Sequence, residues 1–155
     1  MEIITHENDC EKRLLTNDYC PNPAMKNCFQ TQFFTCTLRK IELCGQTLNQ
    51  FHVDEGAQFL LMHLTVHNMT NEILSMFKED FYIKFDGEGP FEPEEEFGVT
   101  HQFPDTYALK PNEEMKGVLV FLIAQDTKKI VFSYTEYFDD ESEGKTYRLK
   151  YDLKS

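Results

Sequence analysis

The chain has 155 residues, a length that suits one ordinary domain able to bury roughly two thirds of its unfolded surface. Its 27 Asp and Glu against 15 Lys and Arg give a formal net charge of -12, which disfavours binding to nucleic acid or to anionic membrane surfaces. No run approaches the ~20 apolar residues of a membrane-spanning helix, so we expect no such span.

Residues 1–31 differ in pattern from the rest and are predicted to form an N-terminal extension. A short helix is predicted within NDCEKRLLTND, with Asn8 or Asp9 as its N-cap. The two prolines of CPNPAMKNC indicate an irregular connector after it. The extension is therefore expected to be short and irregular or helical.

The cysteines all lie in the first third of the chain, and their odd number leaves at least one unpaired in a monomer. They are Cys10, Cys20, Cys28, Cys36 and Cys44. Free, partly buried thiols are the simplest interpretation. A disulfide such as Cys10 to Cys20 or Cys20 to Cys28 is the alternative for an exported protein.

From Phe33 onward, apolar residues recur with a period of two, which predicts β-strands. The segment FLLMHLTVH, residues 59–67, shows this alternation most clearly. Its predicted core face holds Leu60, Met62, Leu64 and Val66, and its other face holds Phe59, Leu61, His63, Thr65 and His67.

Four later segments continue the strand pattern. DFYIKFDGEG ends in a glycine-rich turn, GVLVFLIA is apolar on both faces and is predicted to be a central strand, and KKIVFSYTEYF and TYRLKYDLK flank the polar hairpin loop DDESEG. The predicted inward residues are Phe81, Ile83, Phe85, Ile130, Phe132, Tyr134, Tyr147, Leu149, Tyr151 and Leu153. Arg148, Lys150 and Lys154 are charges typical of a protected edge strand.

Six or seven short strands with turn signals between them, and few helical patterns, predict an all-β fold. We expect an antiparallel β-sandwich over residues 32–155.

The order of these segments resembles an immunoglobulin-like domain of unknown function found in bacterial lipoproteins and secreted proteins, often mislabelled telomeric repeat-binding factor 2. The resemblance covers roughly residues 36 to 153 and rests on VHNMTNEIL, DFYIKFDGEG and YALKPNEEMKGVLVFLIAQDTKKIVFSY. The matching positions are Asn68, Asp80-Phe81, Asp86-Gly87, Leu109-Lys110-Pro111, Glu113 and Gly117 to Phe121. Asn112 replaces the usual glycine, and both residue types accept a positive φ.

The resemblance implies an immunoglobulin-like sandwich of about seven strands in a non-enzymatic protein that is secreted or held at the cell envelope. MEIITHENDC lacks the basic and apolar regions of a leader peptide. A cytoplasmic protein is therefore the alternative, unless a leader has been removed.

Candidate catalytic and metal-binding residues are few. His63 and His67 lie about 13 Å apart along a strand, too far to ligate one metal. His6, Cys10, Cys20 and Cys28 supply zinc-ligand types, but at irregular spacing. No hydrolase elbow, zinc-protease motif or phosphate-binding loop is present in the sequence. We expect no enzymatic activity, no cofactor and no bound metal.

Two acidic clusters are the most distinctive polar feature, and neither has calcium-loop spacing. The predicted partner-binding residues are Asp86, Glu88, Glu92, Glu94, Glu95, Glu96, Asp139, Asp140, Glu141 and Glu143, with Glu136 nearby. They are interpreted either as solvated loop tips or as a docking surface for a basic protein.

The sequence therefore predicts a non-enzymatic protein-binding or accessory domain at the bacterial cell envelope, with a protein partner of basic charge. The alternative is an intracellular acidic inhibitor or immunity-type protein that blocks a toxin or a nucleic-acid enzyme.

Overall fold

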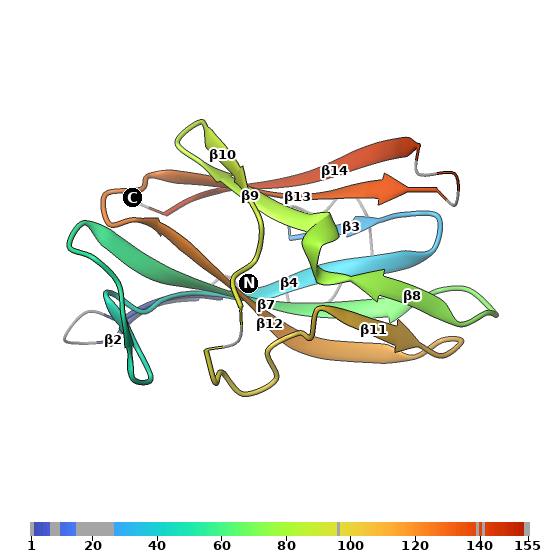
Figure 1. Cartoon of the computed structure of the whole chain (residues 1–155), viewed down its shortest axis with the longest axis horizontal. Coiled ribbons are helices and arrows are strands. Elements are labelled where there is room, and N and C mark those ends of the chain that lie inside the picture. The colour runs from blue at the N-terminus through green and yellow to red at the C-terminus, as the bar shows by residue number, and fades with distance from the viewer. Residues whose placement is uncertain are drawn as a thin grey trace.

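The computed structural model describes residues 2–6, 10–14, 27–95, 97–138, 140 and 142–153, with the backbone only for 2–6 and 10–14. Two β-sheets pack face to face in this part of the chain (Figure 1). The elements are β1 Glu2–His6, β2 Cys10–Leu14, β3 Cys28–Gln30, β4 Phe34–Leu43, β5 Thr47–Leu48, β6 Phe51–His52, β7 Ala57–Asn68, β8 Leu74–Phe77, the 3-10 turn η1 Lys78–Asp80, β9 Phe81–Phe85, β10 Glu88–Phe91, β11 Thr106–Leu109, β12 Glu114–Ala124, β13 Lys129–Tyr137 and β14 Glu143–Asp152.

The first sheet has the order β12-β7-β4-β1-β2, and β3 pairs with β4. The second sheet has the order β10-β9-β13-β14, and β11-β8 and β5-β6 form separate two-stranded ribbons. Every pair of strands is antiparallel except β1 with β4. The predicted all-β antiparallel sandwich is confirmed.

The main core lies between the two sheets and is rich in aromatic rings. The predicted inward face of β7 is buried, and Phe81 of β9 stacks on Phe132 of β13 with ring centroids 5.8 Å apart. The other predicted inward residues of β9, β13 and β14 are also buried, apart from the half-buried Tyr147. The period of two was therefore sufficient to assign the core faces of these strands.

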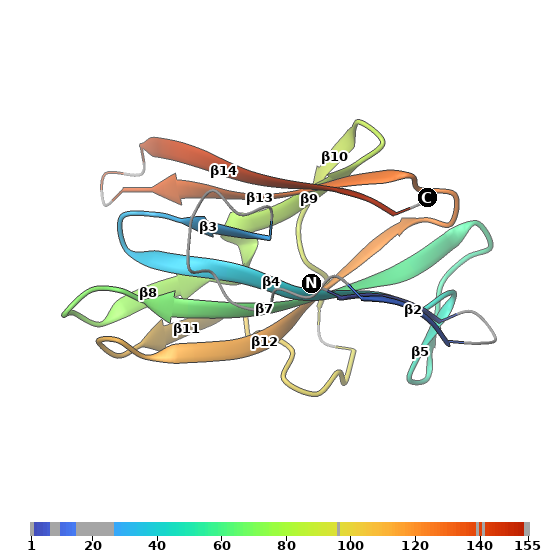
Figure 2. The ribbon, with the colours of Figure 1, turned by 180° about the vertical axis from the view of Figure 1, so that it is seen from behind.

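The helix predicted around Cys10 is wrong within the described residues, because Cys10–Leu14 is strand β2. It pairs with β1, which runs parallel to the second half of β4, while β3 pairs with the first half. Figure 2 shows β3 facing β14 across the sandwich. A helix this short is marginal alone, and pairing onto an open sheet edge satisfies the same backbone groups. The division after residue 31 stays a prediction.

The prediction of a central strand at Gly117–Ala124 is also wrong, because β12 lies at the edge of the first sheet. The irregular segment between β10 and β11 forms hydrogen bonds with backbone groups along the free edge of β12. The Val118 N–H donates to the His101 carbonyl, the Phe103 N–H to the Val118 carbonyl, and the Glu94 N–H to the Val120 carbonyl. The strand is apolar on both faces because this segment covers its outer face as well.

A second apolar cluster lies under that covering segment, on the outer face of the first sheet. Its buried members are Phe59, Leu61, Val118 and Val120, packed against Cys44, Leu48, Val53, Phe97, Val99 and Leu122. The sequence assigned Phe59 and Leu61 to the face opposite the core, and the second cluster was not predicted. A strand pattern shows which side chains share a face but not what covers it.

Asn68 joins two loops at one end of the sandwich. Its side chain is fully buried, and its Nδ2 lies 2.8 Å from the Glu72 carbonyl, 3.1 Å from that of Leu109 and 3.0 Å from that of Lys110. Its Oδ1 accepts from the Thr70 N–H and hydroxyl. One amide thereby sets the positions of the chain entering β8 and of the chain leaving β11.

We expect Asn68→Asp to lower the free energy of unfolding by about 3 kcal/mol, because a carboxyl group cannot donate to these buried carbonyls as the amide does. Urea unfolding monitored by circular dichroism measures the loss. Asn71→Asp, in the exposed part of the same turn, is the matched control and should change stability by less than about 0.5 kcal/mol. Equal effects of the two substitutions would contradict the role assigned to Asn68.

Gly117 allows the ring of Phe103 to pack directly on β12. A Cβ atom added at Gly117 would lie 2.7 Å from two ring carbons of Phe103, which is itself buried. The absence of a side chain at Gly117 is therefore a packing requirement.

We expect Gly117→Ala to destabilise the protein by about 2 kcal/mol through this overlap. The double variant Gly117→Ala/Phe103→Leu should be less destabilised than the sum of the two single variants, because the smaller side chain leaves room for the methyl group. Thermal unfolding of the three variants and the wild type measures the coupling, and strict additivity would contradict the packing argument.

Candidate functional site

The histidines of β7 occupy half-buried positions on the outer face of the first sheet. His63 Nε2 lies 2.9 Å from Glu42 Oε1 on the neighbouring β4, and His67 points from the same face. The interpretation of this segment as a plain strand with half-buried polar residues agrees with the structure. Among the side chains that the structure describes, no group of three metal-ligating residues comes together.

The cysteines are in different chemical states. Cys28 is disulfide-bonded, so its sulfur is not a thiolate ligand for the zinc set considered from the sequence. The side chains of His6, Cys10 and Cys20 lie outside the described residues. Cys36 is a free, buried thiol, and burial raises its pKa well above the usual range. Burial therefore disfavours a reactive thiolate at Cys36.

The first acidic cluster comprises Asp86, Glu88, Glu92, Glu94, Glu95 and Glu96, and in sequence it begins in the β9–β10 turn and continues past the end of β10. Asp86 accepts from the backbone N–H groups of Lys128 and Lys129, so its carboxylate joins two turns of the second sheet. Glu88 is exposed on β10, Glu94 is half-buried, and Glu96 lies outside the described residues. Burial, with a contribution from the charge of Glu95, raises the pKa of Glu94.

The second acidic cluster comprises Glu136, Asp139, Asp140, Glu141 and Glu143, and in sequence it extends from the end of β13 to the start of β14. Glu136 is buried and accepts from the Tyr147 hydroxyl and the Lys145 N–H, which gives it a local structural role. Asp140 is exposed, and hydrogen bonds from Ser142 lower the pKa of its carboxyl group. Glu143 is exposed, while Asp139 and Glu141 lie outside the described residues.

The structure does not bring the two clusters together. Asp86 is bonded to the beginning of β13, whereas the second cluster follows its end, and the nine residues of β13 span roughly 26 Å. A single partner would have to cover the length of the sandwich to touch both. The two clusters are therefore separate candidate surfaces.

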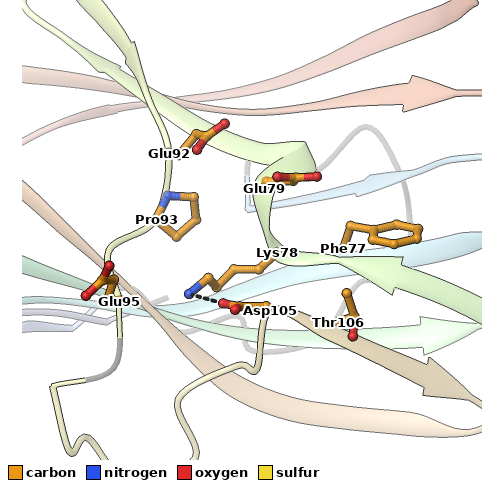
Figure 3. A pocket seen from close by; sticks show the side chains of 8 residues that line it. All are labelled: Phe77, Lys78, Glu79, Glu92, Pro93, Glu95, Asp105 and Thr106. Atoms are coloured by element: carbon orange, nitrogen blue, oxygen red, sulfur yellow. Dashed lines mark ion pairs between the residues drawn. The ribbon is translucent and has the colours of Figure 1, made fainter. Parts of the chain in front are cut away.

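The first cluster borders a pocket with an accessible volume of about 280 Å³ (Figure 3). Three segments form it: the end of β8 with η1, the chain after β10, and the start of β11. The lining residues are Phe77, Lys78, Glu79, Glu92, Pro93, Glu95, Asp105 and Thr106. Sequence reasoning found Glu92 and Glu95 but missed the rest, because the pairing of β8 with β11 brings them together.

Lys78 is the unusual residue of this pocket, because a lysine side chain is seldom buried and needs a partner where it is. Only 8% of the residue is exposed. Its Nζ donates to the Glu94 carbonyl at 3.0 Å and lies 3.1 Å from Asp105 Oδ1. The Asp105 side chain is 90% exposed, so the pair joins a buried cation to a carboxylate in water.

Asp80 ends η1 beside the pocket and is half-buried. Burial, helped by the negative charge of Glu79, raises the pKa of its carboxyl group to about 6. Burial, with a smaller contribution from the charge of Asp80, raises the pKa of Tyr107 and of Tyr134. A carboxyl group with a raised pKa therefore lies in the same 3-10 turn as Lys78.

The chain belongs to the family described as Domain of unknown function (DUF4352), whose model matches residues 30–146. The resemblance seen in the sequence is confirmed, including the positive φ of Asn112 in the turn before β12. No curated protein matches the chain.

Several solved structures are similar to the chain, including the following three. The ycdA protein of Bacillus subtilis subsp. subtilis str. 168, described as a candidate lipoprotein, has a TM-score of 0.66 at 12% identity. The alignment covers 83% of this chain and 39% of that one, so the chain spans well under half of that protein. The yjhA protein of Bacillus subtilis has a TM-score of 0.58 at 16% identity, covering 69% of this chain and 77% of that one. A conserved hypothetical protein from Bacillus anthracis has a TM-score of 0.54 at 15% identity, covering 81% and 94%.

These likenesses establish the sandwich fold. The family is one of unknown function, and one of the similar structures is of a protein described as a candidate lipoprotein. Within the described part of the chain, no helix is long and apolar enough to cross a membrane.

We expect Asp80→Asn to stabilise the protein above pH 6 and to have little effect below pH 4. A raised pKa in the folded state means that ionised Asp80 opposes folding, and this cost disappears when the group is protonated in both states. Because the carboxyl group is partly solvated, we expect a gain of only about 1 kcal/mol at pH 8. Urea unfolding from pH 4 to 8 measures it.

Glu88→Gln on exposed β10 is the control and should leave stability nearly unchanged across this range. A gain for Asp80→Asn that is the same at pH 4 and pH 8 would contradict the assignment.

Proposed function

We propose that this chain is a non-enzymatic protein-binding or accessory domain of the bacterial cell envelope. The partner is a basic protein, and it docks on the part of the first acidic cluster that borders the Lys78 pocket. The observation that carries the proposal is the group of three pocket carboxylates, Glu79, Glu92 and Glu95, which have no ion-pair partner among the described residues.

The surroundings of these carboxylates support a protein partner. Phe77 lines the same pocket with 44% of its surface exposed, and Phe91 at the end of neighbouring β10 is 42% exposed. Exposed aromatic rings beside unpaired charges are typical of binding surfaces, since the ring supplies contact area and the charge supplies steering. Unpaired carboxylates also attract a basic protein over a longer range than contact.

Several observations support an accessory role over catalysis. The half-buried histidines lie on a strand face, and burial raises the pKa of the Cys36 thiol. The sandwich also resembles ycdA, described as a candidate lipoprotein. The disulfide at Cys28 fits an oxidising compartment outside the cytoplasm.

Binding of a decalysine peptide tests the acidic surface. We expect wild type to bind it in dilute buffer, and the triple variant Glu79→Gln/Glu92→Gln/Glu95→Gln to bind at least roughly tenfold more weakly, because the unpaired charges are removed. Isothermal titration calorimetry measures both affinities. Added salt should weaken wild-type binding more steeply than binding by the variant.

The control is Asp54→Asn/Glu55→Gln/Glu114→Gln, which removes the same amount of charge from exposed positions outside the pocket. This variant should bind nearly as well as wild type. Equal weakening of both triple variants would mean that net charge alone attracts the peptide, and would overturn the proposed surface.

Fractionation of the source cells tests the location. Recovery of the native protein from the envelope or the medium agrees with the proposal. Recovery only from the cytosol would contradict it and favour an intracellular inhibitor of a basic protein.

A further inference from the structure

The Lys78 pocket combines a buried cation with a counterion that is easily replaced. The ammonium group of Lys78 donates to the Glu94 carbonyl, and among the described residues its one carboxylate partner is the exposed side chain of Asp105 (Figure 3). These two contacts use two of the three N–H donors of an ammonium group. A carboxylate that entered the pocket could take the place of Asp105 without leaving Lys78 unpaired.

The rim of the pocket limits which carboxylate could enter. Glu79, Glu92 and Glu95 line the pocket at exposed positions, and Figure 3 shows Glu92 and Glu95 on either side of Pro93. These charges would repel a simple anion. A ligand must therefore carry a positive group a few ångströms from its carboxylate, so that each charge meets its opposite.

The apolar wall indicates what joins the two charges. Phe77 and Pro93 both line the pocket, and Figure 3 shows Pro93 between Glu92 and Glu95, while the Phe77 ring lies on the other side of Lys78. A volume of about 280 Å³ admits a single long side chain. An aliphatic stem can pack on such a wall while its ammonium or guanidinium group remains among the carboxylates.

We infer that the pocket binds lysine or arginine with a free α-carboxylate, as the last residue of a peptide chain or as the free amino acid. The α-carboxylate replaces Asp105 on Lys78 Nζ. The basic side chain lies along Pro93 and ends among the pocket glutamates. This inference rests on the proposed function and specifies which part of a basic partner the pocket holds.

The test compares three probes: an acetylated Ala-Ala-Lys peptide with a free carboxylate, the same peptide amidated, and L-lysine. Calorimetry and NMR titration give the affinities for wild type, Asp105→Asn and Lys78→Met. Asp126→Asn, an exposed aspartate outside the pocket, is the control.

We expect wild type to bind the carboxylate peptide more tightly than the amide. Asp105→Asn should bind the carboxylate peptide more tightly still, by roughly threefold to tenfold, because the competing side chain no longer holds Lys78. Lys78→Met should lose the preference for the carboxylate, and Asp126→Asn should behave as wild type. Similar affinities for peptide and L-lysine would identify the free amino acid as sufficient, and a tighter peptide would identify a chain terminus.

Weaker or unchanged binding of the carboxylate peptide by Asp105→Asn would overturn the inference, because a purely cationic ligand gains nothing from losing a carboxylate. This substitution is at an exposed position, so the test does not depend on the folding of Lys78→Met. If decalysine binds but the carboxylate and amide peptides bind equally, the pocket inference fails while the proposed function stands. If decalysine also fails to bind, both fail.

Discussion

The buried amide of Asn68 is the contact on which the candidate site depends. It is bonded to the chain just before β8 and just after β11, so it places the two strands of that ribbon relative to the main sandwich. The pairing of Phe77 with Thr106 at the other end of the ribbon then sets Lys78 beside Asp105. A hydrogen-bonded residue at one end of the fold thereby determines the geometry of a pocket at the far end of two short strands.

The first sheet is covered both on its outer face and along one edge. The outer face of the first sheet carries its own apolar cluster, and the segment that covers it also bonds to the edge of β12. The same segment contributes Glu94 and Glu95 to the surroundings of Lys78. One irregular stretch thus protects a sheet edge, buries a second core and completes a pocket.

The Lys78 pocket uses its charges differently from the other acidic positions described above. Asp86 and Glu136 hold turns and strands in place, and their carboxylates are used within the fold. The pocket places one buried cation near three carboxylates, those of Glu79, Glu92 and Glu95, that have no ion-pair partner among the described residues. Opposite charges held apart by the fold can distinguish ligands by the spacing of their charges, which a uniformly acidic surface cannot do.

The sequence by itself determined the all-β class, the inward faces of β7, β9, β13 and β14, and the family turns at Asn68, Asp86-Gly87 and Asn112, because these depend on residues close in the chain. It could not determine that β12 is an edge strand, that Cys10–Leu14 is a strand, or that Phe59 and Leu61 lie under a second cluster. Nor could it find Lys78 and Asp105 as a pair. Each of these depends on which distant segment packs against a given strand, and only the tertiary structure decides that, because backbone pairing and burial are satisfied across the whole fold.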